Sequence, residues 1–167
     1  KKLRKDLSVP EVRSNDEWKI FKDFSITGKR LGDPDWLWKP QICREVEMTR
    51  DKPFFSEEGN FGLLPLVEGR MVHQYRCNAK RYVSGTGRKA IWKPSLGGFL
   101  NEIIPQYHYP IDQLKNEPKR RMNINRVGFC DITGQTNERT MLSAKIPAGV
   151  ICGNKVPTII FEDAADQ

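Results

Sequence analysis

The sequence predicts an α+β fold, with mostly antiparallel or mixed β-structure and few short helices, and three observations carry this prediction. Apolar and polar residues alternate over short stretches, which glycine, proline and asparagine separate. The regular succession of strand and helix that a doubly wound parallel sheet requires does not occur. A chain of 167 residues, of which 38% are hydrophobic, is long enough to enclose one hydrophobic core.

Strands are expected wherever this alternation holds, and it is clearest at 140–146. There Leu142, Ala144 and Ile146 share one side, so the stretch should be a half-buried strand. The other expected strands are 17–24, where the alternation is imperfect, 42–48, 63–66, 123–133, 150–152 and 156–161.

The expected connections and helices are short. The glycines of 85–89 are typical of a flexible hairpin turn, which would present Arg88 and Lys89. One helical turn is expected near 111–115, whereas 67–75 fits either a short helix or the end of a strand. Residues 1–15 lack apolar periodicity and are expected to be a tail or linker, which leaves 16–167 as a single domain.

The positive charge is concentrated in one part of the chain. The net charge is +7, and residues 69–101 hold seven basic residues and no acidic one, while the two signs balance on either side. A surface that only needs to be soluble usually mixes both signs, so this segment indicates a polyanionic partner. The alternative is a basic face that acids from elsewhere in the fold pair. We call 69–101 the basic segment; its cations are Arg70, Arg76, Lys80, Arg81, Arg88, Lys89 and Lys93.

The basic segment also holds side chains suited to reading bases. Arginine can bond both major-groove acceptors of guanine, and Gln or Asn can bond adenine in the same two-point way. A second basic cluster at 119–121, with Arg126, would extend the contact. The candidate DNA-binding residues are Arg70, His73, Gln74, Arg76, Asn78, Lys80, Arg81, Arg88, Lys89, Arg120 and Arg121.

Three aromatic residues, Tyr75, Tyr82 and Trp92, are interleaved with these cations. Aromatic rings among Arg and Lys can stack on a displaced base. They can equally anchor a strand to the core, and for Trp92 the core interpretation is favoured.

We expect neither a catalytic site nor a metal site in this chain. The chain has no Gly-x-Ser-x-Gly, no P-loop and no His-Glu-x-x-His, so we do not expect it to be an enzyme by itself. Its cysteines lack zinc-finger spacing, so neither a metal nor a cofactor is expected. No stretch approaches the roughly 20 apolar residues of a membrane span. Lys1 opens no signal peptide, which predicts an intracellular chain with no membrane partner.

Three stretches resemble one family when they are taken together. They are 64–75 (LPLVEGRMVHQY), 126–133 followed by 136–140 (RVGFCDIT and TNERT), and 141–147 with 149–154 (MLSAKIP and GVICGN). Their order and spacing resemble segments of large restriction–modification DNA methyltransferases, which include type IIG fused enzymes and the methyltransferases of BREX and DISARM phage defence. A Gly-Arg element after an apolar strand also resembles the opening of the TaqI-like specificity domain. The chain departs from the family at Val67 and Cys130, where Tyr and Arg are usual.

The resemblance implies sequence-specific recognition of double-stranded DNA for an adenine-N6 methyltransferase of restriction–modification or phage defence. This chain would be the target-recognition region, which follows the catalytic domain, and Lys1 would then be a domain boundary. The family's (Asn/Asp)-Pro-Pro-(Tyr/Phe) tetrapeptide is absent, since the chain has no Pro-Pro. S-adenosylmethionine would bind the parent enzyme and no cofactor would bind this chain.

The expected partners are therefore double-stranded DNA and the methyltransferase domain of the same parent, in the cytoplasm of a bacterium or archaeon. Two alternatives stay open. The chain could be a protein-interaction module that docks the methyltransferase domain or a defence-complex partner through its apolar strands. It could also bind single-stranded RNA through Tyr75 or Tyr82. The 136–139 stretch could contact DNA or buttress a turn, with Arg139 paired to Glu68 or Glu138.

Overall fold

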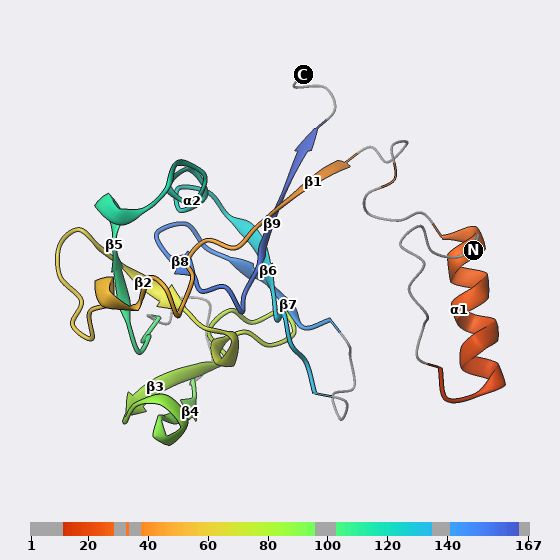
Figure 1. Cartoon of the computed structure of the whole chain (residues 1–167), viewed down its shortest axis with the longest axis horizontal. Helices are drawn as coiled ribbons and strands as arrows, with labels where there is room; N and C mark the ends of the chain where they lie inside the picture. The colour runs from red at the N-terminus through yellow and green to blue at the C-terminus, as the bar shows by residue number, and fades with distance from the viewer. Residues whose placement is uncertain (1–11, 29–32, 34–37, 96–102, 135–140, 164–167) are drawn as a thin grey trace. The chain divides into compact units, whose positions relative to one another are not determined.

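The computed structural model confirms an α+β fold with mixed and antiparallel sheets (Figure 1). The chain forms two compact units, one made of Lys1–Pro40 with Phe161–Gln167 and one of Gln41–Ile160, which we call unit 1 and unit 2. The sequence had suggested one domain from residue 16 onward. The structure describes residues 12–28, 33, 38–95, 103–134 and 141–163.

Unit 1 contains helix α1 (Asn15–Thr27), so the strand expected at 17–24 was wrong. The side chain of Ser14 accepts a hydrogen bond from the Glu17 N–H at 3.1 Å, and the Glu17 carboxylate accepts one from the Arg13 N–H at 2.6 Å. Ser14 is thus the N-cap, and Glu17 satisfies the N–H of Arg13 just before it, so both residues of the Ser-x-x-Glu pattern stabilise the start of the helix. That local signal outweighs the weak alternation of apolar residues. None of the helix residues is buried.

A four-stranded sheet has the order β1-β9-β6-β7. Its central strand β6 is antiparallel to both β7 and β9, so that Val127 lies opposite Lys145 on one side and Ile159 on the other. The strand expected at 42–48 begins and ends earlier, because only Val46 of its second half pairs, through one parallel bridge to Gly153. The strands are β1 (Trp38–Cys43), β6 (Arg126–Phe129), β7 (Ser143–Ile146) and β9 (Thr158–Asp163).

A three-stranded sheet has the order β5-β2-β8. Strand β2 (Leu63–Val67) pairs antiparallel with β5 (His108–Pro110) and parallel with β8 (Ile151–Cys152). The strands expected at 63–66 and 150–152 are thereby confirmed.

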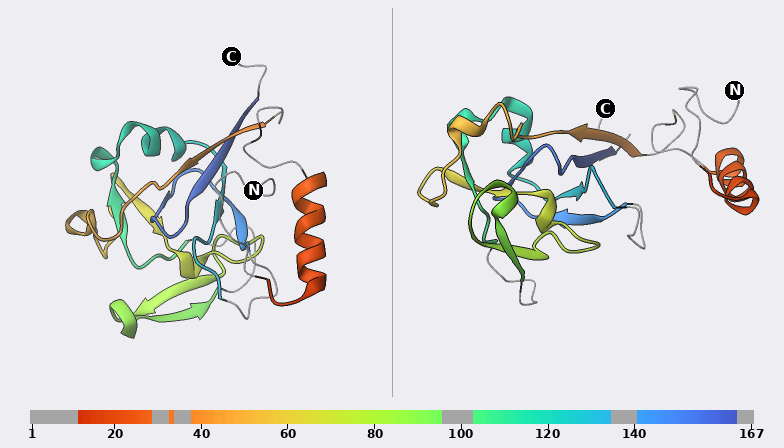
Figure 2. Two further views of the ribbon diagram at one scale, coloured as in Figure 1. Left: turned by 45° about the vertical axis from the view of Figure 1, so that its right-hand side comes forward. Right: turned by 60° about the horizontal axis from the view of Figure 1, so that its bottom comes forward.

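Part of the basic segment forms a separate hairpin of β3 (Lys80–Ser84) and β4 (Ile91–Pro94). The hairpin is coloured green near the bottom of Figure 1 and of the left view in Figure 2. The short 3-10 helix η3 (Gly87–Lys89) lies at its tip, which confirms the expected hairpin turn. Gly85 has a φ of +82°, and a Cβ there would lie 2.6 Å from the Lys89 carbonyl oxygen. Only glycine fits this corner without strain.

The remaining helices are short. The 3-10 helix η4 (Ile111–Gln113) confirms the helical turn expected near 111–115, but α2 (Asn116–Arg121) was not expected. Between β2 and the hairpin, the stretch 67–75 combines the end of a strand with the 3-10 helix η2 (Gly69–Met71). A further 3-10 helix, η1 (Lys52–Phe54), precedes β2.

The described parts of the three family-like stretches supply most of one hydrophobic cluster, and the first and third stretches also contribute to a second cluster. Strand β2 of the first stretch pairs with β8 of the third, and β6 of the second pairs with β7 of the third. Val67, Ile146 and Cys152 are each 0% exposed in the cluster that results. The apolar residues of these stretches therefore hold the fold together. The segment 136–140 lies outside the described residues.

A charged pair sits inside this core. The side chains of Arg126 and Glu45 are both 0% exposed, with Nε–Oε1 and Nη2–Oε2 distances of 2.5 and 2.7 Å. Arg126 also donates to the Val150 carbonyl at 3.0 Å, and Glu45 accepts from the Cys152 N–H and the Thr158 hydroxyl. Burial lowers the pKa of Arg126, but the hydrogen bonds and charge of Glu45 raise that pKa overall, so the guanidinium stays charged. We expected Arg126 to extend a DNA contact, and its burial shows that expectation to be wrong.

Candidate nucleic-acid interface

The hairpin has an inner and an outer face. Tyr82 lies opposite Trp92 on the inner face, and both side chains are half-buried. Arg81 lies opposite Lys93 on the outer face, where both are exposed. Like charges directly opposite each other destabilise a strand pair. The outer face therefore carries a charge arrangement that folding alone does not favour.

The inner face packs the hairpin against the rest of unit 2. Trp92 packs against the core, and its ring meets that of Tyr82 edge-on at 5.7 Å. The Tyr82 hydroxyl donates to the Gly85 carbonyl at 2.7 Å, and its N–H donates to the Ile104 carbonyl at 3.1 Å. The core interpretation of Trp92 is confirmed, and Tyr82 is also occupied by packing. Neither ring is displayed for stacking on a base.

Two arginines of the segment brace it through backbone carbonyls. The Arg70 guanidinium lies 5.8 Å from the centre of the Trp92 ring and donates to the Gly87 carbonyl at 3.5 Å. Arg76 donates to the Ser95 carbonyl at 3.3 Å. Both residues remain exposed. Each arginine has several N–H donors, so these contacts orient the charge without neutralising it.

Among the described residues, no acidic side chain pairs with the cations of the basic segment. All seven are exposed, and none forms an ion pair with a carboxylate in the part of the chain that the structure describes. The alternative in which acids from elsewhere pair this face therefore finds no support in the described residues. The described arginines of unit 2 outside the segment are all paired: Arg44 with Asp131, Arg50 with Asp51, Arg120 and Arg121 with Glu117, and Arg126 with Glu45.

Between η2 and β3, a tight turn presents other candidate residues. The backbones of His73 and Arg76 exchange hydrogen bonds of 2.8 and 3.0 Å, and both side chains are exposed. Gln74 and Asn78 are half-buried, and the Gln74 side-chain oxygen accepts from the Ser143 N–H at 3.4 Å. That oxygen is thus engaged within the fold, whereas His73 and Arg76 face outward.

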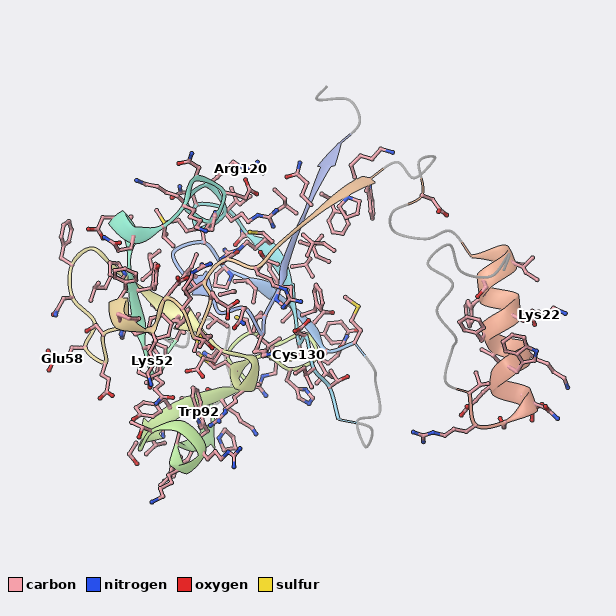
Figure 3. The ribbon with its side chains drawn as sticks, in the orientation of Figure 1. Lys22, Lys52, Glu58, Trp92, Arg120 and Cys130 are labelled. Atoms are coloured by element: carbon pink, nitrogen blue, oxygen red, sulfur yellow. The ribbon has the colours of Figure 1, made fainter. Side chains whose placement is uncertain are left out.

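The two arginines expected from the second basic cluster differ in the structure. Arg121 is 1% exposed, pairs with Glu117 at 2.6 Å and donates to the carbonyls of Thr158 and Gln41 at 3.1 and 2.9 Å. The prediction that Arg121 contacts DNA was wrong, because its guanidinium is enclosed. Arg120 is exposed but pairs with Glu117 at 3.2 Å. It also lies at the opposite end of unit 2 from Trp92 in Figure 3, so it does not extend the hairpin surface.

The charge pattern of the segment holds one residue that our list of candidates missed. Lys93 was counted among the cations of the basic segment but was left out of the list of candidate DNA-binding residues. The register places it directly across from Arg81. Counting outward from both sides of the glycine turn would have found this pairing, because strand register follows from the length of the turn.

A hollow of about 600 Å³ in unit 2 does not suit DNA, because side chains of both charges line it. Its charged residues are Arg44, Glu45, Glu47, Arg50, Asp51, Lys115 and Glu117. Several of them are already joined in the ion pairs described above.

No metal centre is formed by the described residues. Glu-x-Lys, which some metal-dependent nucleases contain, occurs at 17–19 and at 117–119. Glu117 is held by two arginines, and no group of three or more His, Cys, Asp or Glu side chains that could bind a metal occurs in the described ranges.

Comparison with known proteins leaves the family undecided. No protein-family model, no curated protein and no solved structure matched the chain. The methyltransferase resemblance therefore stands on the three stretches alone. Among the described residues, no helix has both the length and the apolar character needed to cross a lipid bilayer.

Proposed function

We propose that unit 2 binds double-stranded DNA through the β3–β4 hairpin and the turn at 73–76, as the target-recognition part of an adenine-N6 DNA methyltransferase. The observation that carries the proposal is the contrast in ion pairing. Every described arginine of unit 2 outside the basic segment has a carboxylate partner, while Arg70, Arg76, Arg81 and Arg88 have none among the described residues.

The shape of the hairpin is consistent with this partner. A two-stranded ribbon is narrow enough for the major groove, which is about 12 Å wide. Arg81 and Lys93 lie opposite each other on the exposed face, where the negative charge of a phosphate would relieve their mutual repulsion. Arg88 and Lys89 in η3 extend the positive surface to the tip. Phosphate contacts would fix the register, and base contacts would select the sequence.

Salt dependence tests the phosphate contacts directly. Binding of the whole chain to a mixed-sequence duplex would be measured by fluorescence anisotropy over a series of salt concentrations. The double variant Arg88→Gln/Lys89→Gln should bind all sequences more weakly, and the slope of log K against log salt should fall by about 2, since each lost phosphate contact removes about 0.9.

The matched control changes the same charge at the other end of unit 2. Lys115 and Lys119 are exposed residues at the start of α2 and within it. Lys115→Gln/Lys119→Gln should leave the slope nearly unchanged. An equal loss of slope in both double variants would mean that only net charge matters. No salt-dependent duplex binding by the unaltered chain would rule out the proposal.

Base reading has a separate test. Selection of bound duplexes from a randomised pool should return a preferred sequence. Arg81→Ala should relax the preference at one position, because a good two-point contact contributes about 1–3 kcal/mol of discrimination. Unchanged preference in Arg81→Ala, together with weaker overall binding, would reassign Arg81 to the phosphates.

A protein-interaction role remains the second candidate, and one observation favours it for unit 1. Helix α1 exposes the apolar residues Ile20, Phe24 and Ile26 at 56%, 72% and 64%. A helix that buries no residue usually has another surface to cover its apolar side chains. Replacement of these three residues by Gln should leave DNA binding intact but abolish capture of the methyltransferase domain. Loss of DNA binding instead would argue against a docking role.

A further inference from the structure

The turn between η2 and β3 holds an aromatic residue in an unusual backbone conformation. Tyr75 has a φ of +64°, and among the described non-glycine residues it alone has a positive φ. This left-handed conformation is uncommon for a bulky residue, because its Cβ crowds the following carbonyl group. Glycine would adopt it without cost.

Packing does not explain why tyrosine occupies this position. The Tyr75 side chain is 77% exposed, and it forms no hydrogen bond or ring contact with another side chain in the described residues. The other two aromatic residues that the structure describes in the basic segment, Tyr82 and Trp92, pack against each other. Strain without a packing role points to a function for the side chain.

Hydrogen bonds to strand β7 hold the turn in place. The Tyr75 N–H donates to the Ser143 carbonyl at 2.8 Å, and the Ser143 N–H donates to the side chain of Gln74 at 3.4 Å. The paired backbones of His73 and Arg76 close the turn. Strand β7, which begins at Ser143, therefore fixes the backbone that presents the ring. A ring displayed from a fixed backbone loses little conformational freedom when it binds.

We propose that Tyr75 is a stacking platform for a nucleobase that has left the base stack of duplex DNA, an inference that rests on the proposed DNA binding. The face of a base inside a continuous stack is covered by its neighbours, so a single ring on a turn can stack only on a displaced or unpaired base. The exposed side chains of His73 and Arg76 lie next to Tyr75 in the turn, where they can contact the adjacent backbone. The cationic hairpin follows this turn in the chain and would contact the phosphates of the paired DNA that flanks the displaced base.

The test compares a fully paired duplex with one that carries a single bulged 2-aminopurine, a fluorescent base whose emission falls on stacking. Binding of the whole chain to each duplex is measured at one salt concentration. The unaltered chain should prefer the bulged duplex by about 5- to 100-fold, the range that stacking of one base on an aromatic side chain provides. The fluorescence of 2-aminopurine should fall in the complex.

Two variants separate stacking from folding. Tyr75→Gly removes the ring and relieves the backbone, so its melting temperature should be equal or higher while the preference for the bulged duplex and the fluorescence change disappear. Tyr75→Phe keeps the ring and should retain both. The fully paired duplex should bind both variants with almost the affinity and salt slope of the unaltered chain.

The outcomes distinguish this inference from the proposed function. Salt-dependent binding of the paired duplex without any preference for the bulge, or with a preference that survives in Tyr75→Gly, overturns the stacking role and leaves DNA binding standing. No binding of either duplex overturns both. Tighter, Tyr75-dependent binding of a single-stranded RNA of the same sequence shows that the partner class was wrongly assigned.

Discussion

The arginines of unit 2 fall into two groups that use the same side chain for different purposes. Outside the basic segment, the described arginines all join carboxylates, and two of them, Arg121 and Arg126, are almost fully enclosed. Inside the segment, Arg70, Arg76, Arg81 and Arg88 are exposed and have no carboxylate partner among the described residues. Arg44, Arg121 and Arg126 of the first group join distant parts of the chain, while the second group keeps its charge available to solvent or a ligand.

The difference shows that the surroundings, and not the type of residue, decide what an arginine does. A buried guanidinium loses its hydrogen bonds to water, so fixed protein groups must replace them. Around Arg126 these groups are the Glu45 carboxylate and three backbone carbonyls. An exposed one keeps its hydration and can exchange water for phosphate. The two groups should therefore respond to mutation in opposite ways.

The largest expected effect is on the buried pair. Arg126→Met should reduce the free energy of unfolding by about 3–5 kcal/mol, because it leaves the Glu45 carboxylate buried without its cation. Urea unfolding measures this. The double variant Arg126→Met/Glu45→Leu should recover much of the loss, since both charges are then gone. A single variant within 1 kcal/mol of the unaltered chain would show that the pair is dispensable.

The neighbouring arginines of α2 sharpen the comparison. Arg121→Gln should cost about 2–3 kcal/mol, because buried hydrogen bonds of a charged group to Glu117 and to two carbonyls are lost. Arg120→Gln should cost less than about 1 kcal/mol, as expected of an exposed ion pair. Thermal and urea unfolding of the two variants provide the comparison. Equal losses would contradict the difference in burial.

A smaller effect, of opposite sign, is expected on the hairpin. Arg81→Gln removes one of two like charges that face each other, so stability should rise by a few tenths of a kcal/mol at low salt. The gain should shrink as salt screens the repulsion. DNA affinity should fall in the same variant. Reduced stability together with unchanged affinity would indicate a structural role for Arg81.

The smallest expected effect is the dependence of stability on pH. It involves His108 of unit 2 and neither group of arginines. Burial lowers the pKa of His108 below its usual value near 6.5, and this effect outweighs a backbone hydrogen bond to Ser56 that raises the pKa. The unfolded chain therefore binds the proton more readily than the folded chain does. Stability contributed by neutral His108 is full above pH 6.5 and declines as the pH falls below it. His108→Gln should remove this decline from the melting temperature measured between pH 7.5 and pH 5.5.

Local patterns predicted much of the fold. Strands β2, β7 and β8 and the hairpin turn were expected from alternation and glycine, which act over a few residues. Helix α1 was missed although the N-cap Ser14 and Glu17 are visible in the sequence, because the weak alternation of apolar residues over 17–24 is typical of a strand. Helix α2 was missed because it is only 6 residues long, too short for a helical period to show.

The sequence by itself determined where the excess charge lies, because the absence of acids from 69–101 is a property of composition. It could not determine which cations stay exposed. Arg120 and Arg121 are adjacent and chemically identical, yet only Arg121 is enclosed. Its partners Thr158 and Gln41 lie 37 and 80 residues away in the chain, so only the packing of α2 against β1 and β9 decides its burial. Burial is set by contacts between distant segments, and neighbouring residues do not encode it.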